Sequence, residues 1–257
     1  MALGIVYQVK NDSAAAEQIY LQGIDKAADK VSLRRELAHL YLKQQRYQEA
    51  EAQFKEVLKQ KGLSLDHTLN ANFALCRIGL RNKAYDDVIK RAKRLIALYP
   101  PLPHGYQFLA SAYLAKGKVD AAISVFESLV EANRQSPVPY QELAIIAMDR
   151  KQAYKQALNY AREGAKRFPD DARTQDVLGW VYYQQGDYES ASSQFQIATR
   201  QAPDNARFFY HLGLALQKLG KKEQARATYR RAIGLINQAE SEAFAEELKL
   251  RIKNLED

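Results

Sequence analysis

Small and aromatic residues recur along the chain at an interval of 34 residues. The stretch Leu178–Pro203 reads LGWVYYQQGDYESASSQFQIATRQAP, and the same order of residue types returns one interval later. Gly179 then corresponds to Gly213, and Phe195 to Tyr229. Within an interval the large apolar residues fall three, four or seven positions apart, which is the period of one face of an α-helix. The pattern predicts two helices per interval.

The residue types at fixed positions indicate how these two helices pack. We number each unit so that Leu178 takes position 7. Small residues at positions 8 and 20 allow two antiparallel helices to approach closely, and large residues at positions 4, 7, 11, 17 and 24 fill the space between them. Gly186 at position 15 is expected to end the first helix. Pro203 at position 32 cannot continue the second.

Six full units can be placed along the chain. Their predicted ranges are 31–68, 69–102, 103–136, 137–171, 172–205 and 206–238. The unit at 69–102 departs most from the pattern, with Val88 at position 20 where Ala is usual. Four additional residues lie within KQKGLSLDHT after the first full unit, and one lies near Arg150 to Ala153 in the fourth.

The two ends of the chain differ from the interior. Residues 1–30 contain a further unit that starts at position 5, inside its first helix, with Gly4 at position 8 and Tyr20 at position 24. We interpret it as a truncated unit of a longer array, and the alternative is a native, shortened capping repeat. Residues 239–257 leave the pattern, and their apolar residues share one helical face. These are Phe244, Leu248, Ile252 and Leu255.

The sequence resembles the tetratricopeptide repeat family, of bacterial type, over nearly all of residues 1–235. The family pattern is W-x2-L-G-x2-Y, then A-x3-F, then P, over 34 residues. The resemblance implies an all-α fold, a right-handed superhelical solenoid of antiparallel helix pairs that forms one domain. Residues 239–257 would then be a C-terminal capping helix, which solenoids need to cover their last unit.

Composition and charge narrow the choice of partners. The chain has 257 residues, 47% of them hydrophobic, and a net charge of +8 from 38 basic and 30 acidic residues. The densest basic cluster is Lys90, Arg91, Lys93 and Arg94, which we interpret as a solvated helix face. No nucleic-acid-binding motif accompanies it, so no nucleic-acid partner is expected. No apolar run is long enough to insert into a membrane, no signal peptide is recognisable, and the compartment, cytoplasmic or periplasmic, stays open.

No catalytic motif is present, and few residues suit a metal or a nucleophile. Cys76 is the only cysteine, so disulfides within the chain and cysteine-based metal sites are excluded, and we expect it to be buried. His39, His104 and His211 fall on the first helices of units too far apart to share one ion. We therefore expect a protein that is not an enzyme and that has no cofactor or metal.

The resemblance implies that the first helices line a concave groove, with positions 2, 5, 6, 9, 12 and 13 facing a ligand. Trp180, the only tryptophan, takes position 9. Since Trp, Tyr and Arg dominate interface hot spots, we predict a binding cluster of Trp180, Tyr183, Arg207 and Tyr210. The alternative for Trp180 is packing against the neighbouring first helix. A weaker predicted cluster consists of Phe73, Arg77, Gln107 and Phe108.

These observations favour a non-catalytic scaffold that binds a protein or peptide in its groove. A clamp for the terminal carboxylate of chaperones, known in one subclass of the family, is not expected, because three consecutive units do not supply its Lys, Asn and Arg set. One alternative is an accessory module of a larger envelope assembly or enzyme, as in exopolysaccharide export, pilus or secretion machinery. Self-assembly into a homo-oligomer through the N-terminal end is a third hypothesis.

Overall fold

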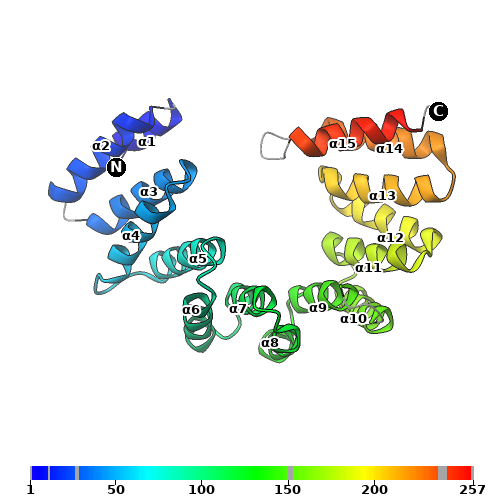
Figure 1. Ribbon diagram of the computed structural model, residues 1–257, viewed down its shortest axis with the longest axis horizontal. Helices are drawn as coiled ribbons and strands as arrows, with labels where there is room; N and C mark the ends of the chain where they lie inside the picture. The colour runs from blue at the N-terminus through cyan, green and yellow to red at the C-terminus, as the bar shows by residue number, and fades with distance from the viewer. Residues whose placement is uncertain (1, 11, 27–28, 150–152, 237–241, 256–257) are drawn as a thin grey trace. The chain divides into compact units, whose positions relative to one another are not determined.

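The computed structural model describes residues 2–10, 12–26, 29–149, 153–236 and 242–255, which form fifteen α-helices and no β-strand (Figure 1). The chain divides into two compact units, residues 1–125 and 126–257. The all-α prediction is confirmed. Each unit is a succession of helix pairs, and we describe the two in turn.

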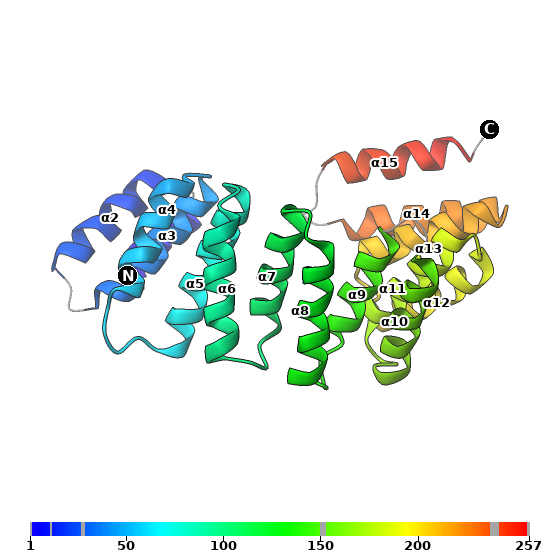
Figure 2. The same cartoon turned by 60° about the horizontal axis from the view of Figure 1, so that its bottom comes forward.

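The first unit contains seven complete helices and the start of an eighth. From α1 to α7 each helix packs on the next along the chain, and the first helices of successive pairs, α3, α5 and α7, also contact one another (Figure 2). The helices are α1 (Ala2–Val9), α2 (Ser13–Lys26), α3 (Lys30–Lys43), α4 (Tyr47–Leu58), α5 (Leu65–Arg81), α6 (Tyr85–Leu98), α7 (Pro103–Ala115) and α8 (Val119–Ala132), the last of which crosses the unit boundary.

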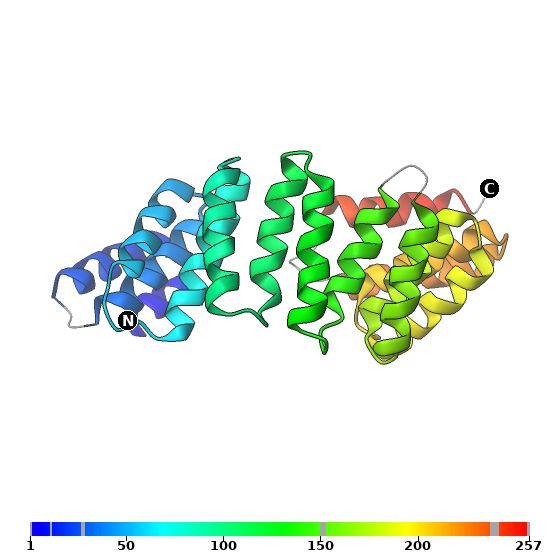
Figure 3. The same ribbon diagram turned by 90° about the horizontal axis from the view of Figure 1, so that it is seen from below.

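The second unit continues the same order of helices. The first helices of its pairs, α9, α11 and α13, contact one another in turn, and the succession can be followed by colour from green to orange in Figure 3. The helices are α9 (Val138–Met148), α10 (Tyr154–Arg167), α11 (Ala172–Gln185), α12 (Tyr188–Gln201), α13 (Ala206–Lys218), α14 (Lys222–Leu235) and α15 (Glu242–Lys253).

Local chemistry sets several helix ends. The carboxylates of Asp171 and Asp187 accept hydrogen bonds from backbone N–H groups at the starts of α11 and α12, which satisfies donors that have no partner inside the helix. Gly186 ends α11 with a φ of 84°, a left-handed conformation that a residue with a Cβ adopts at a cost. The predicted helix end at Gly186 is confirmed, and α12 ends at Gln201, two residues before Pro203.

The helix pairs close on small residues, as the sequence predicts. Gly179 and Gly213 lie so near the rings of Phe195 and Tyr229 that an added Cβ would collide with them. Both rings are fully buried. In most pairs position 20 is an alanine with no exposed surface; these residues are Ala16, Ala50, Ala122, Ala157, Ala191 and Ala225.

 The exception is the α5–α6 pair, in which Val88 takes position 20 and Ala92 follows one helical turn later.

The four additional residues after the first full unit form most of an extra helical turn. Helix α5 begins at Leu65, four residues before the predicted start of its repeat at residue 69. It has 17 residues, whereas α3 has 14. Ser64 caps it by accepting a hydrogen bond from the backbone N–H of His67. The additional residue predicted near Arg150 to Ala153 lies largely outside the described residues, which resume at Ala153.

Helix α15 covers the last helix pair. Leu248 is fully buried and Leu255 is nearly so, in one apolar cluster with Leu212 and Tyr229, and Phe244 packs against that cluster. The predicted capping helix is confirmed. In Figure 1, α15 lies directly beside α14.

Candidate functional site

A groove crosses the first helices of the second unit. It encloses about 750 Å³ between α9, α11 and α13, and we call it the second-unit groove. Its lining combines apolar, cationic and anionic side chains, which are Ile145, Met148, Asp149, Tyr154, Arg173, Asp176, Val177, Trp180, Gln184, Asn205, Arg207, Phe208 and His211. Two of the predicted binding residues, Trp180 and Arg207, are among them.

Trp180 is held in the wall of the groove by rings from two helices. Its indole stacks on Tyr183 at a centroid distance of 5.2 Å and contacts the ring of His211 at 4.9 Å. Because His211 belongs to α13, Trp180 does pack against the neighbouring first helix, as the alternative interpretation held. The indole remains half-buried and lines the groove as well. Tyr183 stacks on the indole but is not among the residues that line the groove.

His211 is fixed by an acidic partner on the preceding first helix. Its Nδ1 lies 2.7 Å from Oδ1 of Asp176, a side chain that is 11% exposed. The imidazole also contacts the ring of Phe195 at 5.5 Å. From the sequence alone, His211 is expected only as a polar residue of the inner face. The signal for its pairing is the Asp one repeat earlier, since 35 residues separate the two partners and bring them to neighbouring helices.

Cationic side chains stand at the rim of the groove. Nη2 of Arg173 donates to Oε1 of Glu142 over 3.0 Å, and the Arg173 side chain is 51% exposed. The guanidinium of Arg207 lies over the ring of Phe244 at 5.9 Å. Ion pairs this exposed are weak, so Arg173 can exchange its partner for a ligand carboxylate at small cost.

Tyr210 lies against α15 and not among the residues that line the groove. Its hydroxyl donates to Oε1 of Glu247 over 2.5 Å, and its ring contacts Phe244 at 5.4 Å. The guanidinium of Arg251 lies 5.4 Å from the same ring. Burial, together with the hydrogen bond to Glu247, raises the pKa of Tyr210 to about 12. In this structure Tyr210 therefore anchors the capping helix.

The weaker predicted cluster lies in the first unit, on α5 and α7. Phe73 stacks on His104 at 4.8 Å and contacts Phe108 at 5.8 Å. Both phenylalanines are half-buried and pack against the core around Cys76. Arg77 is exposed one turn further along α5, and Gln107 is half-buried on α7. The structure thus brings Phe73 and Phe108 together as a joint between two first helices.

Other side chains singled out in the sequence have structural surroundings. Cys76 is fully buried, and burial raises the pKa of its thiol to about 12. Nε2 of His39 donates a hydrogen bond to Oδ1 of Asn70 over 3.1 Å, and burial lowers the pKa of the imidazole. Over the described ranges, no three His, Cys, Asp or Glu side chains gather as a metal site would require. No helix in those ranges is both long and apolar enough to cross a membrane.

Comparison with known proteins agrees with the repeat pattern. The tetratricopeptide repeat matches residues 1–63, 35–103 and 177–240, and a second form of the same repeat matches residues 103–136. A TPR repeat-containing protein of Methanocaldococcus jannaschii is 24% identical over 161 residues, which are 59% of this chain and 28% of that protein. Tetratricopeptide repeat protein 8 of Caenorhabditis elegans is 25% identical over 148 residues, or 56% of this chain and 29% of that protein.

The chain spans less than a third of the length of these two relatives, so each match covers only a part of the relative.

Among solved structures, a tetratricopeptide repeat protein from Parabacteroides merdae superposes with a TM-score of 0.67. It is 15% identical, and the superposition covers 100% of this chain and 97% of that one, which is evidence on the fold alone. The chain belongs to the tetratricopeptide repeat family, whose members are repeat scaffolds for protein interaction and are generally non-catalytic.

Proposed function

We propose that the chain is a non-catalytic scaffold that binds an extended segment of a partner protein in the second-unit groove. The observation that carries this proposal is the half-buried Trp180 in the wall of a groove of about 750 Å³. Tryptophan and arginine in a partly enclosed site are the side chains that most often dominate interface energetics. Both types are present here, since Arg173 and Arg207 line the same groove as Trp180.

The partner segment is expected to carry an apolar side chain next to an acidic one. The apolar side chain would lie on Trp180, Val177 and Phe208, and the acidic one would pair with Arg207 or Arg173. The stack of Tyr183, Trp180 and His211 supports this geometry, because it holds the indole in place before any ligand arrives. Such preorganisation lowers the entropic cost of binding.

The test begins with a display library of random peptides selected against the wild-type protein. The affinity of the selected peptides is then measured by calorimetry for Trp180→Ala, Trp180→Phe and Arg207→Gln. We expect Trp180→Ala to weaken binding by about 30-fold, the loss typical of a hot-spot residue, and Trp180→Phe to retain part of the affinity. Arg200→Gln is the matched control, since Arg200 is exposed on α12 and lies outside the groove.

Circular dichroism and thermal melting would show that each variant stays folded. If Trp180→Ala and Arg207→Gln both bind the selected peptides as the wild type does, the groove is not the binding site. Tyr210 is left unchanged in these variants because it anchors α15, so that its loss would disturb the cap as well as any interface.

The alternatives from the sequence remain predictions. An accessory role in a larger envelope assembly has no observation of its own in the structure. Self-association is motivated by α1, where the apolar side chains of Leu3, Val6 and Val9 are 52%, 47% and 79% exposed. Light scattering at increasing protein concentration tests it, and a constant monomer mass would reject it.

A further inference from the structure

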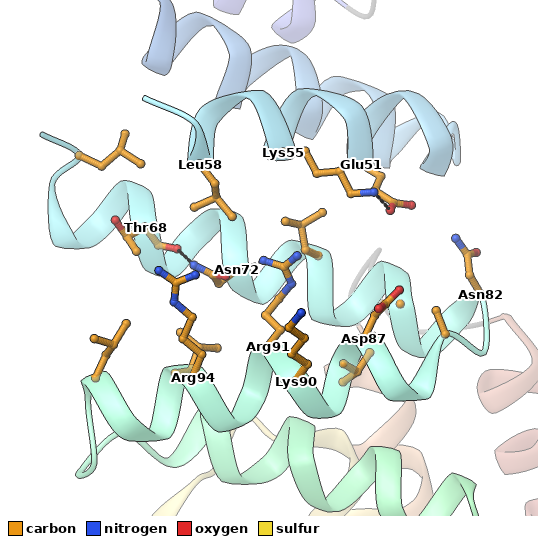
Figure 4. Close-up of a pocket in the computed structure, with 17 residues that line it drawn as sticks. Glu51, Lys55, Leu58, Thr68, Asn72, Asn82, Asp87, Lys90, Arg91 and Arg94 are labelled. Atoms are coloured by element: carbon orange, nitrogen blue, oxygen red, sulfur yellow. Dashed lines mark hydrogen bonds and ion pairs between the residues drawn. The ribbon is translucent and has the colours of Figure 1, made fainter. Parts of the chain in front are cut away.

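A second cavity lies in the first unit, on the side of the second helices. It encloses about 530 Å³ between α4 and α6, with α5 as its floor (Figure 4). No residue of α3 or α7 lines it, so it is not part of the surface that the first helices would form as a groove. We call it the α4–α6 cavity.

Two departures from the repeat pattern contribute to this cavity. Position 11 is Gly79, where the neighbouring pairs have Tyr41 and Tyr113, so the large side chain that fills this place elsewhere is missing. The additional residues before α5 also supply part of the wall, because Leu63 lies in the longer connection and Thr68 in the extra turn. The cavity therefore lies at the repeat 69–102, whose sequence departs most from the repeat pattern.

The charges around the cavity are unequal. Lys55, Lys90, Arg91 and Arg94 line it against the two carboxylates of Glu51 and Asp87. Two of the cations are engaged, since Lys55 pairs with Glu51 over 2.7 Å and Nη1 of Arg91 donates to Oδ1 of Asn72 over 2.8 Å.

Lys90 and Arg94 are exposed and form no hydrogen bond or ion pair with any of the described residues. From the sequence, the basic cluster of α6 is expected to be a solvated face, and Lys90, Lys93 and Arg94 are indeed exposed. Three of its four residues also line the cavity, and Lys93 lies outside the lining.

The geometry of the two unpaired cations indicates what would bind. They are four residues apart on α6, which is about 6 Å along the helix axis. Acidic residues two apart in an extended segment repeat at nearly the same spacing, about 6.7 Å. Across the cavity, α4 contributes Leu58 at its end in addition to the paired Glu51 and Lys55 (Figure 4). Leu63, in the connection after α4, adds a second aliphatic side chain to the lining.

We propose that the α4–α6 cavity binds an extended acidic segment of a protein partner, in which acidic and aliphatic residues alternate. The acidic side chains would face Lys90 and Arg94 on α6, and the aliphatic ones would face Leu58 and Leu63. A nucleic acid fits less well, because no aromatic side chain is among the described residues that line the cavity, so bases would have no ring to stack on. This site is independent of the second-unit groove.

The experiment uses a fluorescein-labelled peptide of alternating Glu and Leu, and its counterpart of alternating Gln and Leu, in fluorescence anisotropy titrations. We expect the acidic peptide to bind the wild type, and Lys90→Gln with Arg94→Gln to weaken binding by about tenfold or more. The matched control is Lys93→Gln with Lys61→Gln, which removes the same charge from two exposed residues outside the cavity. We expect it to change the affinity by less than about twofold.

Two further variants separate this site from general charge attraction and from the second-unit groove. Leu98→Ser changes a cavity residue that is 55% exposed, and it should weaken the acidic peptide without unfolding the protein. Trp180→Ala should leave the affinity for the acidic peptide unchanged, so the two proposals fail separately.

Three results would overturn the assignment. The first is an equal loss of affinity in both double variants, which would mean a diffuse charge effect. The second is that the peptide of alternating Gln and Leu binds as tightly as the acidic peptide. The third is that a short single-stranded oligonucleotide binds more tightly than the acidic peptide and that its binding depends on Lys90 and Arg94.

Discussion

Gly179 of α11 occupies a place where any side chain would collide with the paired helix. A Cβ at this position would lie 2.7 Å from both Cδ1 and Cε1 of Phe195, and 3.2 Å from the carbonyl oxygen of Ala191. Phe195 is fully buried, so its ring has little freedom to move away. We predict that Gly179→Ala destabilises the second unit, although alanine is the better helix former.

The magnitude follows from two opposing effects. Replacing glycine by alanine inside a helix stabilises it by about 1 kcal/mol, whereas overpacking a core costs about 1–3 kcal/mol. The α3–α4 pair combines Ala38 with Phe54 at the equivalent positions, both fully buried, so a helix pair can accommodate this Cβ when its backbones stand slightly further apart. With an overpacking cost near 2 kcal/mol, the net loss is about 1 kcal/mol.

The control is Gly234→Ala on α14, where nothing lies within 4 Å of the added Cβ. It should stabilise the unit by up to about 1 kcal/mol, so the two alanine variants should differ by about 2 kcal/mol. Urea unfolding followed by circular dichroism and by the fluorescence of Trp180 measures both. The reasoning is refuted if Gly179→Ala unfolds at the same urea concentration as the wild type, or at a higher one.

Three further predictions concern other parts of the chain. Arg46 donates to both carboxylate oxygens of Glu17 over 2.6 and 3.1 Å and lowers its pKa, so Glu17→Gln should cost about 1 kcal/mol at neutral pH. The ionised carboxylate of Glu17 contributes this stability, which is fully present above its unfolded pKa of 4.5 and is lost as the pH falls through the lower pKa of the folded state. The difference between Glu17→Gln and the wild type should therefore shrink below pH 4.5, and a pH-independent gap in urea midpoints would contradict the prediction. Leu248→Ala should cost about 2–5 kcal/mol and speed hydrogen exchange in α15, whereas Leu250→Ala, at a side chain 58% exposed, should do neither. The buried Cys76 should resist iodoacetamide at neutral pH until the protein unfolds, and labelling as fast as that of free cysteine would show that it is accessible.

Most of the fold was predictable because its main contacts lie inside one repeat. Positions 8 and 24 of the same pair meet, as Gly4 and Tyr20 do in the first pair, and the 34-residue interval shows both of them. The helix end at Gly186 was predictable for the same reason, since a left-handed residue at the end of a helix is a local requirement.

The candidate site was less predictable because its contacts join different repeats. The pair of Asp176 and His211 depends on how closely α11 and α13 approach each other, which the pattern of a single repeat does not determine. Tyr210 was predicted to face a partner, but its surroundings depend on α15, which follows no repeat. For Trp180 the repeat pattern allows either a place in the groove or packing against the neighbouring first helix. In the structure the indole lines the groove and also contacts His211 of α13.

The degenerate unit at 69–102 shows that a departure from the repeat can be a compensated change. Gly79 replaces the usual aromatic residue at position 11, and Val88 replaces the usual alanine at position 20. The two are linked, because a Cβ at Gly79 would lie 2.6 Å from Cγ2 of Val88. The valine thus takes part of the space that a ring fills in other pairs. Since a valine is smaller than a tyrosine, the exchange preserves the contact between α5 and α6 while leaving unfilled volume beside it, and Gly79 and Val88 both line the α4–α6 cavity.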